Sequence, residues 1–138
     1  MPEQKDSSQN KEEIELYEED IYEQKEKEEE KVLLVNFRLS NEWYGIEITK
    51  VKEVSMVGEI TYLPSVPDYV LGIVNLRGNI SAVVDLKKIL GLEPEAIHER
   101  TRLIVTEVGK VQLTILVDEV FNVVEIPVSK IEPVLSTI

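Results

Sequence analysis

The chain has 138 residues, contains no cysteine and carries a formal net charge of −12. This length fits one domain with a tail, and the lack of cysteine excludes disulfides, thiolate metal sites and a cysteine nucleophile. The acidic balance disfavours nucleic-acid binding, and the sequence has no apolar run of signal-peptide or membrane-spanning length, so we expect a cytoplasmic protein that does not insert into a membrane.

The first 31 residues carry most of the charge. They hold 13 acidic and 5 basic side chains, net −8, which leaves −4 for residues 32–138. Ile14, Tyr17 and Ile21 follow helical spacing, but neighbouring acidic residues repel one another, so an isolated helix here would be marginal. We interpret residues 1–31 as an acidic tail, disordered or helical, and residues 32–138 as the folded domain; a tail helix would need a partner to dock on.

From Val32 onward the apolar residues follow the pattern of β-strands. The sequence predicts strands over residues 32–39, 43–48, 69–77, 80–86, 102–108, 111–117 and 121–126, with a brief pairing within 60–63. It predicts short helical turns over residues 49–54, 87–90 and 129–131. Many short strands joined by tight turns indicate an all-β barrel or a pair of barrels.

Two tight turns are predicted from Gly pairs. Gly78-Asn79 is expected to join two apolar arms that are buried on both faces, and Gly109-Lys110 is expected to form a Gly-first type II′ turn. Gly91 should close the helix at 87–90 as a left-handed C-cap.

The turn at 49–54 is predicted to be helical because Thr49 is a suitable N-cap. In such a helix Val51 and Val54 face inward and Glu53 faces outward. Glu53 is therefore expected on the surface.

No combination of residues indicates catalysis. His98 lies in a polar loop, where a surface histidine is far commoner than a catalytic one. Asp85 and Asp118-Glu119 interrupt apolar runs, but acidic residues at strand ends are ordinary turn residues. The sequence has no nucleophile elbow, phosphate-binding Gly-rich loop or dinucleotide fingerprint. We therefore expect a binding protein, not an enzyme, with no metal and no cofactor.

Polar residues within residues 72–86 give the strongest functional signal. Asn75 and Arg77 stand where a strand ordinarily carries Val or Ile, so their polarity requires a partner. Arg77 should lie at a strand end beside a tight turn. There it is either a solvated surface side chain or an anchor in a local network or an interface.

Three blocks of sequence point to a known family. They are YGIEITKVKEV at residues 44–54, the run from Leu63 to Leu92, and ILVDEVFNVVEI at residues 115–126. In this order they resemble the CheW-like family, which includes the chemotaxis coupling protein CheW and the regulatory domain of the histidine kinase CheA. The resemblance implies two interlocked five-stranded barrels of small Greek-key, SH3-like type. Family members continue with a further hairpin, so the end at Ile138 implies that the second barrel is incomplete.

The resemblance also implies a function and partners. It implies a non-catalytic adaptor that couples chemoreceptors to CheA by binding the regulatory domain of the kinase and the cytoplasmic tip of methyl-accepting receptors. An alternative is a self-associating or regulatory β module that has lost receptor coupling, with a homodimer formed through an open sheet edge. The family's partner-binding positions correspond here to Val51, Glu53, Gly72, Asn75, Leu76, Arg77, Gly78, Val120 and Val123.

Among these positions, Val120 and Val123 are expected to face the kinase. Val51, Leu76 and Val123 could equally be core residues. Glu53 and Arg77 are harder to explain as structural, because a charged residue on an apolar scaffold is usually solvated or paired.

Overall fold

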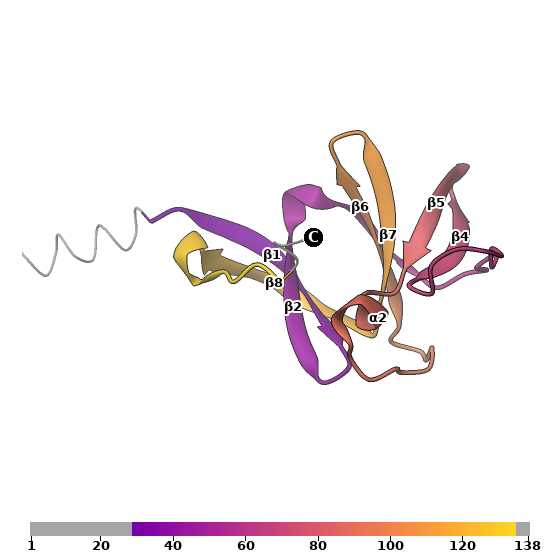
Figure 1. Ribbon diagram of the computed structural model, residues 1–138. Coiled ribbons are helices and arrows are strands. Elements are labelled where there is room, and N and C mark those ends of the chain that lie inside the picture. Colours follow the sequence, from indigo (N-terminus) through magenta and orange to yellow (C-terminus); the bar gives the residue numbers. More distant parts are fainter. Residues whose placement is uncertain (1–28, 135–138) are drawn as a thin grey trace, which may run out of the picture. The chain divides into compact units, whose positions relative to one another are not determined.

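A computed structural model describes residues 29–134 of the chain. Strands dominate these residues, and the predicted all-β fold is confirmed (Figure 1). The predicted tail stripe of Ile14, Tyr17 and Ile21 lies outside the described residues. The elements are β1 (Lys31–Leu39), β2 (Glu42–Glu47), η1 (Ile48–Lys50), β3 (Val51–Met56), β4 (Val70–Leu76), β5 (Asn79–Val84), α2 (Leu86–Leu90), β6 (Arg102–Val108), β7 (Val111–Val117), β8 (Glu119–Pro127) and η2 (Val128–Lys130).

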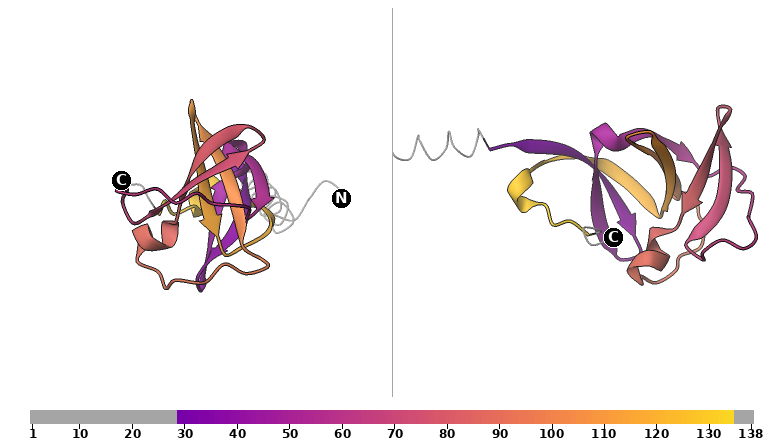
Figure 2. Two further views of the ribbon diagram at one scale, coloured as in Figure 1. Left: turned by 90° about the vertical axis from the view of Figure 1, so that its right-hand side faces the viewer. Right: turned by 45° about the horizontal axis from the view of Figure 1, so that its top comes forward.

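The strands form two sheets. One has three strands in the order β2-β1-β8, and the other has five in the order β3-β6-β7-β5-β4. The five-stranded sheet is antiparallel except where β5 meets β7, and there the strands are parallel. This contact places the β4–β5 and β6–β7 hairpins side by side (Figure 2).

Strands β6 and β7 are buried on both faces over residues 103–106 and 114–117. Successive side chains of a strand point to opposite faces of its sheet. Accordingly, Leu103 and Leu116 join one apolar cluster with Val74 and Val83. The alternate residues, Ile104, Ile115 and Val117, join another with Phe37 and Leu39 of β1. The second cluster therefore connects the two sheets.

The β4–β5 hairpin differs from its prediction in two respects. Its two-residue turn is Arg77-Gly78, because Leu76 pairs with Asn79 across the strands. Both turn residues have positive φ, 54° and 84°, which defines a type I′ turn. The arms are not buried throughout, since Ile80 is exposed near the tip. The longest buried stretches lie instead in β6 and β7, over residues 103–106 and 114–117.

The prediction of a helical turn at residues 49–54 is wrong. A 3₁₀ turn at Ile48–Lys50 leads directly into β3. Val51 is half-buried against the core, but Val54 is exposed. The apolar spacing was compatible with both periods, and pairing with β6 selected the strand.

The remaining predicted elements agree with the structure at their main features. The β6–β7 hairpin has the predicted bounds, with positive φ at Gly109. Asp85 caps α2, and Gly91 ends it with a φ of 69°. Residues 60–63 pair with β4 through one bridge between Thr61 and Ile73.

Candidate partner-binding site

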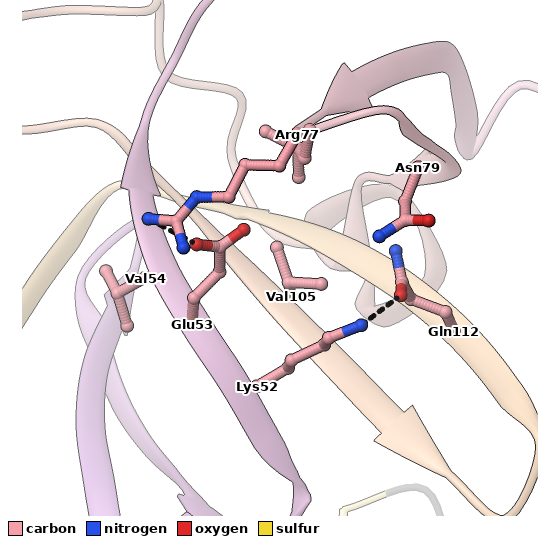
Figure 3. Close-up of a pocket in the computed structure, with 8 residues that line it drawn as sticks. Lys52, Glu53, Val54, Arg77, Asn79, Val105 and Gln112 are labelled. Atoms are coloured by element: carbon pink, nitrogen blue, oxygen red, sulfur yellow. Dashed lines mark hydrogen bonds and ion pairs between the residues drawn. The ribbon is translucent and has the colours of Figure 1, made fainter.

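A groove lies beside the tip of the β4–β5 hairpin, and we call it the hairpin groove (Figure 3). It has a volume of about 360 Å³. Apolar side chains of three strands and charged or amide groups line it together. Its residues are Lys52, Glu53 and Val54 from β3, Leu76, Arg77 and Asn79 from the hairpin, Val105 from β6 and Gln112 from β7.

An ion pair joins two sides of the hairpin groove. The Nη2 atom of Arg77 lies 3.4 Å from the Oε2 atom of Glu53, and the side chains are 86% and 24% exposed. Figure 3 shows the arginine reaching from the hairpin turn toward β3. A pair this exposed is screened by water and contributes less than about 1 kcal/mol to folding. The guanidinium is therefore held in place weakly and stays accessible to a partner.

A β-bulge on β3 determines where Glu53 points. Val51 pairs with Thr106 and Glu53 pairs with Val105, so Lys52 is an extra residue on the β3 side. A bulge shifts the side-chain alternation by one position and redirects the residues after it. Lys52 itself donates from Nζ to Oε1 of Gln112 at 3.1 Å.

The turn determines the position of the Arg77 backbone. The backbone N–H of Gly78 donates to Oδ1 of Asn75 at 3.0 Å, which bridges the turn from the preceding strand. Arg77 is thus anchored on a short, capped turn opposite the bulge. The structure brings Glu53, Leu76 and Arg77 into one groove, with Asn75 and Gly78 supporting the turn.

The other predicted site residues lie elsewhere. Gly72 is buried where β4 meets Thr61. Val51 and Val120 are half-buried and pack on the core cluster that joins the sheets. Val123 is exposed on β8, in the three-stranded sheet.

A buried ion pair was missed by the sequence analysis. Nζ of Lys87 lies 2.5 Å from Oδ1 of Asp118, and both side chains are 2% exposed. The other carboxylate oxygen, Oδ2, accepts the Ser40 N–H at 2.7 Å, so both oxygens of Asp118 are bonded. The only sequence signal was the acid within the apolar run of β7 and β8. Nothing local marked Lys87, because its partner is 31 residues away.

Arg38 is the centre of a second polar network, next to Ser40. Its guanidinium bonds to Glu95 at 3.0 Å and to Glu119 at 3.2 Å. The hydrogen bond from Arg38 lowers the pKa of Glu95 to about 2, with a smaller contribution from His98 in the same direction. His98 Nε2 lies 2.8 Å from Glu95, so the predicted surface histidine helps to fix the loop before β6.

Within residues 29–134, no group of three or more His, Cys, Asp or Glu side chains is arranged to hold a metal ion. Nor does any helix within the same range have the length and apolar character needed to cross a membrane.

Comparison with known proteins gives a consistent result. Residues 33–138 match the family model of the CheW-like domain. The chain is 35% identical over 97 residues to "Chemotaxis protein CheW" of Klebsiella aerogenes, covering 70% of this chain and 58% of that protein. It is 33% identical over 99 residues to the protein of the same name from Bacillus subtilis, covering 72% and 64%. The chain thus matches less than two thirds of the length of each relative.

A solved structure agrees with the sequence matches. The crystal structure of the scaffolding protein TtCheW from Thermoanaerobacter tengcongensis superposes with a TM-score of 0.70 at 36% identity. The superposition covers 75% of this chain and 71% of that one.

Proposed function

Because the chain belongs to the family of CheW-like domains, we propose that it is a cytoplasmic, non-catalytic adaptor that couples chemoreceptors to the histidine kinase CheA. The related proteins are named for chemotaxis or scaffolding, which supports an adaptor function. The observation that carries the proposal is the Arg77–Glu53 pair at the hairpin groove.

The hairpin groove suits the side of a receptor helix. Val54 and the half-buried Leu76 offer apolar surface to such a helix, and the ion pair adds charge beside it. Arginine is favoured at interface anchors because its planar fork makes several directed hydrogen bonds. In the adaptor, Arg77 would contact the cytoplasmic tip of the receptor.

The kinase would bind a different surface. Val123 is exposed on β8, in the other sheet, and its chemistry is apolar. Val120 supports this strand from the core side, where it packs on the cluster that joins the sheets. Separate surfaces would let the adaptor hold a receptor and a kinase domain at once.

Two matched variants test the proposal. Arg77→Ala should fold normally and bind a receptor-tip fragment about thirtyfold more weakly, the loss typical of a charged interface anchor. Val123→Asp should weaken binding of the CheA regulatory domain and leave receptor binding unchanged. Calorimetric titration of both variants against both partners measures these effects. Equal losses toward both partners, or full receptor binding by Arg77→Ala, would show that the surfaces are wrongly assigned.

A second candidate function is self-association. Trp43 and Phe121 are exposed on the three-stranded sheet, with ring centres 5.7 Å apart in an edge-to-face arrangement. Among the described strands β2 and β8 each have one neighbour, and such edges can pair with a second copy. Sedimentation at micromolar concentration tests this candidate: a dimer that Phe121→Asp converts to a monomer would support self-association, and a parent chain that is already monomeric would reject it.

A further inference from the structure

We propose that Asn75 is a positioning residue, which holds the hairpin turn so that Arg77 projects over Glu53. This inference rests on the proposed function, because the position of Arg77 matters most if Arg77 binds a partner. It changes the role of Asn75 from a contact residue to one that acts through its neighbour.

The turn itself creates the need for such a residue. A type I′ turn requires positive φ at both central positions, and it therefore favours Asn or Gly at the first of them. Here that position is Arg77, with a φ of 54°. The Cβ atom of an ordinary L-residue disfavours this conformation by roughly 1 to 2 kcal/mol. Something outside the two turn residues must stabilise it.

Asn75 supplies that stabilisation. Its Oδ1 atom accepts the Gly78 N–H at 3.0 Å, so the bond spans the turn and encloses Arg77. Asn75 is itself exposed, and its side chain is not needed to fill the core. An acceptor at this position fixes the Gly78 peptide and, with it, the conformation of Arg77.

The bond also determines the direction in which the Arg77 side chain leaves the backbone. The Arg77 side chain is 86% exposed, and its Nη2 atom lies 3.4 Å from Oε2 of Glu53. A contact this weak cannot hold the turn by itself. Asn75 therefore fixes the backbone of the turn, and the turn directs the Arg77 side chain into the hairpin groove.

Binding measurements test whether Asn75 acts through Arg77. Asn75→Ala should bind a receptor-tip fragment about fivefold more weakly, the loss expected for one hydrogen bond. Asn75→Asp retains an acceptor oxygen and should restore affinity to within about twofold of the parent. In an Arg77→Ala background, Asn75→Ala should cost almost nothing further. Additive losses would show that Asn75 contacts the partner directly, and would overturn the proposal.

A second measurement needs no receptor. Nitrogen-15 relaxation of the Arg77 and Gly78 backbone amides should report restricted motion in the parent and in Asn75→Asp, and greater motion in Asn75→Ala. Unchanged motion in Asn75→Ala would also overturn the proposal. If the parent chain does not bind the receptor fragment, the proposed function fails while this measurement still decides the role of Asn75. Should Asn75→Ala not fold, Asn75→Gln, whose amide oxygen is displaced by one methylene, replaces it in both experiments.

Discussion

At Gly72, one hydrogen atom in place of a methyl group lets two backbone segments meet. A Cβ atom there would overlap the carbonyl oxygen of Thr61 and lie 2.8 Å from the carbonyl carbon. Thr61 and Ile73 exchange two backbone hydrogen bonds of 2.9 Å across this contact. The contact brings Ile60 against the cluster inside the five-stranded sheet. Gly72 thus has a structural role at this contact, and its role in partner binding stays a prediction.

Gly72→Ala should destabilise the fold by about 3 kcal/mol, because the new methyl group meets backbone atoms that cannot move without breaking the bridge. Urea unfolding of the parent and the variant measures the difference. Gly58→Ala is the matched control, since a Cβ there would have no atom within 4 Å. A loss of similar size in both variants would contradict the argument, because a methyl group in open space has nothing to displace.

Glu95 makes stability depend on acid pH. Its pKa is about 2 in the folded chain, compared with an ordinary value of 4.5, because Arg38 donates a hydrogen bond to it. A lowered pKa stabilises the fold at pH values above the unfolded pKa, and this contribution is lost as the pH falls toward the folded pKa. The side chain is 33% exposed, so solvent screening keeps the effect to within about 1 kcal/mol.

Glu95→Gln should therefore be less stable than the parent at pH 7, and the difference should shrink between pH 4.5 and pH 2. Urea unfolding at several pH values gives the comparison. Glu93→Gln removes the same charge from the same loop and should show a smaller difference at neutral pH. A gap between Glu95→Gln and the parent that widens on acidification would contradict the argument.

Among the elements, those predicted best are the ones whose signals are local. The β6–β7 hairpin could be predicted to its bounds, because a Gly-first turn separates two strongly apolar runs. The predicted β4–β5 turn lies one residue beyond the observed one, because Gly78 can serve in either turn position and the structure places it second, after Arg77. The local sequence of β3 predicts a helical turn, because the strand that selects its conformation begins about fifty residues later.

The site was predictable only in part, because its geometry depends on contacts between residues distant in sequence. Arg77 and Glu53 could each be singled out as charged residues on an apolar scaffold. Their pairing depends on the bulge at Lys52 and on the turn, and both are set by contacts between strands distant in sequence. Lys87 gave no signal, because a lysine after a helix cap is ordinarily solvated.

The Lys87–Asp118 pair connects α2 to the junction of β7 and β8. Removing one member leaves the other charged and buried, which typically costs about 3 to 5 kcal/mol. Asp118→Ala should fall in this range, because it also deprives the Ser40 N–H of its acceptor. Thermal and urea unfolding measure the loss.

The double variant Lys87→Met with Asp118→Leu is the control for that prediction. It replaces both charges with apolar groups of similar volume, and such replacements are often neutral. It should therefore be more stable than Asp118→Ala. A double variant that is less stable than the single one would mean that the pair itself, and not an uncompensated charge, stabilises the fold.

For the molecule as a whole, both apolar clusters lie within residues 32–126, which form one compact unit. One cluster packs among side chains of the five-stranded sheet, and the other packs side chains of that sheet against β1. The predicted boundary between an acidic tail and a domain at residue 32 stays a prediction. The location of the clusters makes it testable.

Deleting residues 1–28 should leave the thermal midpoint within a few degrees of the full chain, because no residue of either cluster is removed. Calorimetry of the two chains provides the measurement. A midpoint that falls sharply, or a transition that loses its cooperativity, would show that the tail belongs to the fold.

The burial of Lys87 and Asp118 also affects how the stability of the fold changes with temperature. Hydration of a charged group carries a strongly negative entropy, so water stabilises free charges less as the temperature rises. The penalty for keeping this pair away from water therefore shrinks on warming, while the attraction across 2.5 Å persists. The junction between α2 and β8 thus gains relative stability at high temperature.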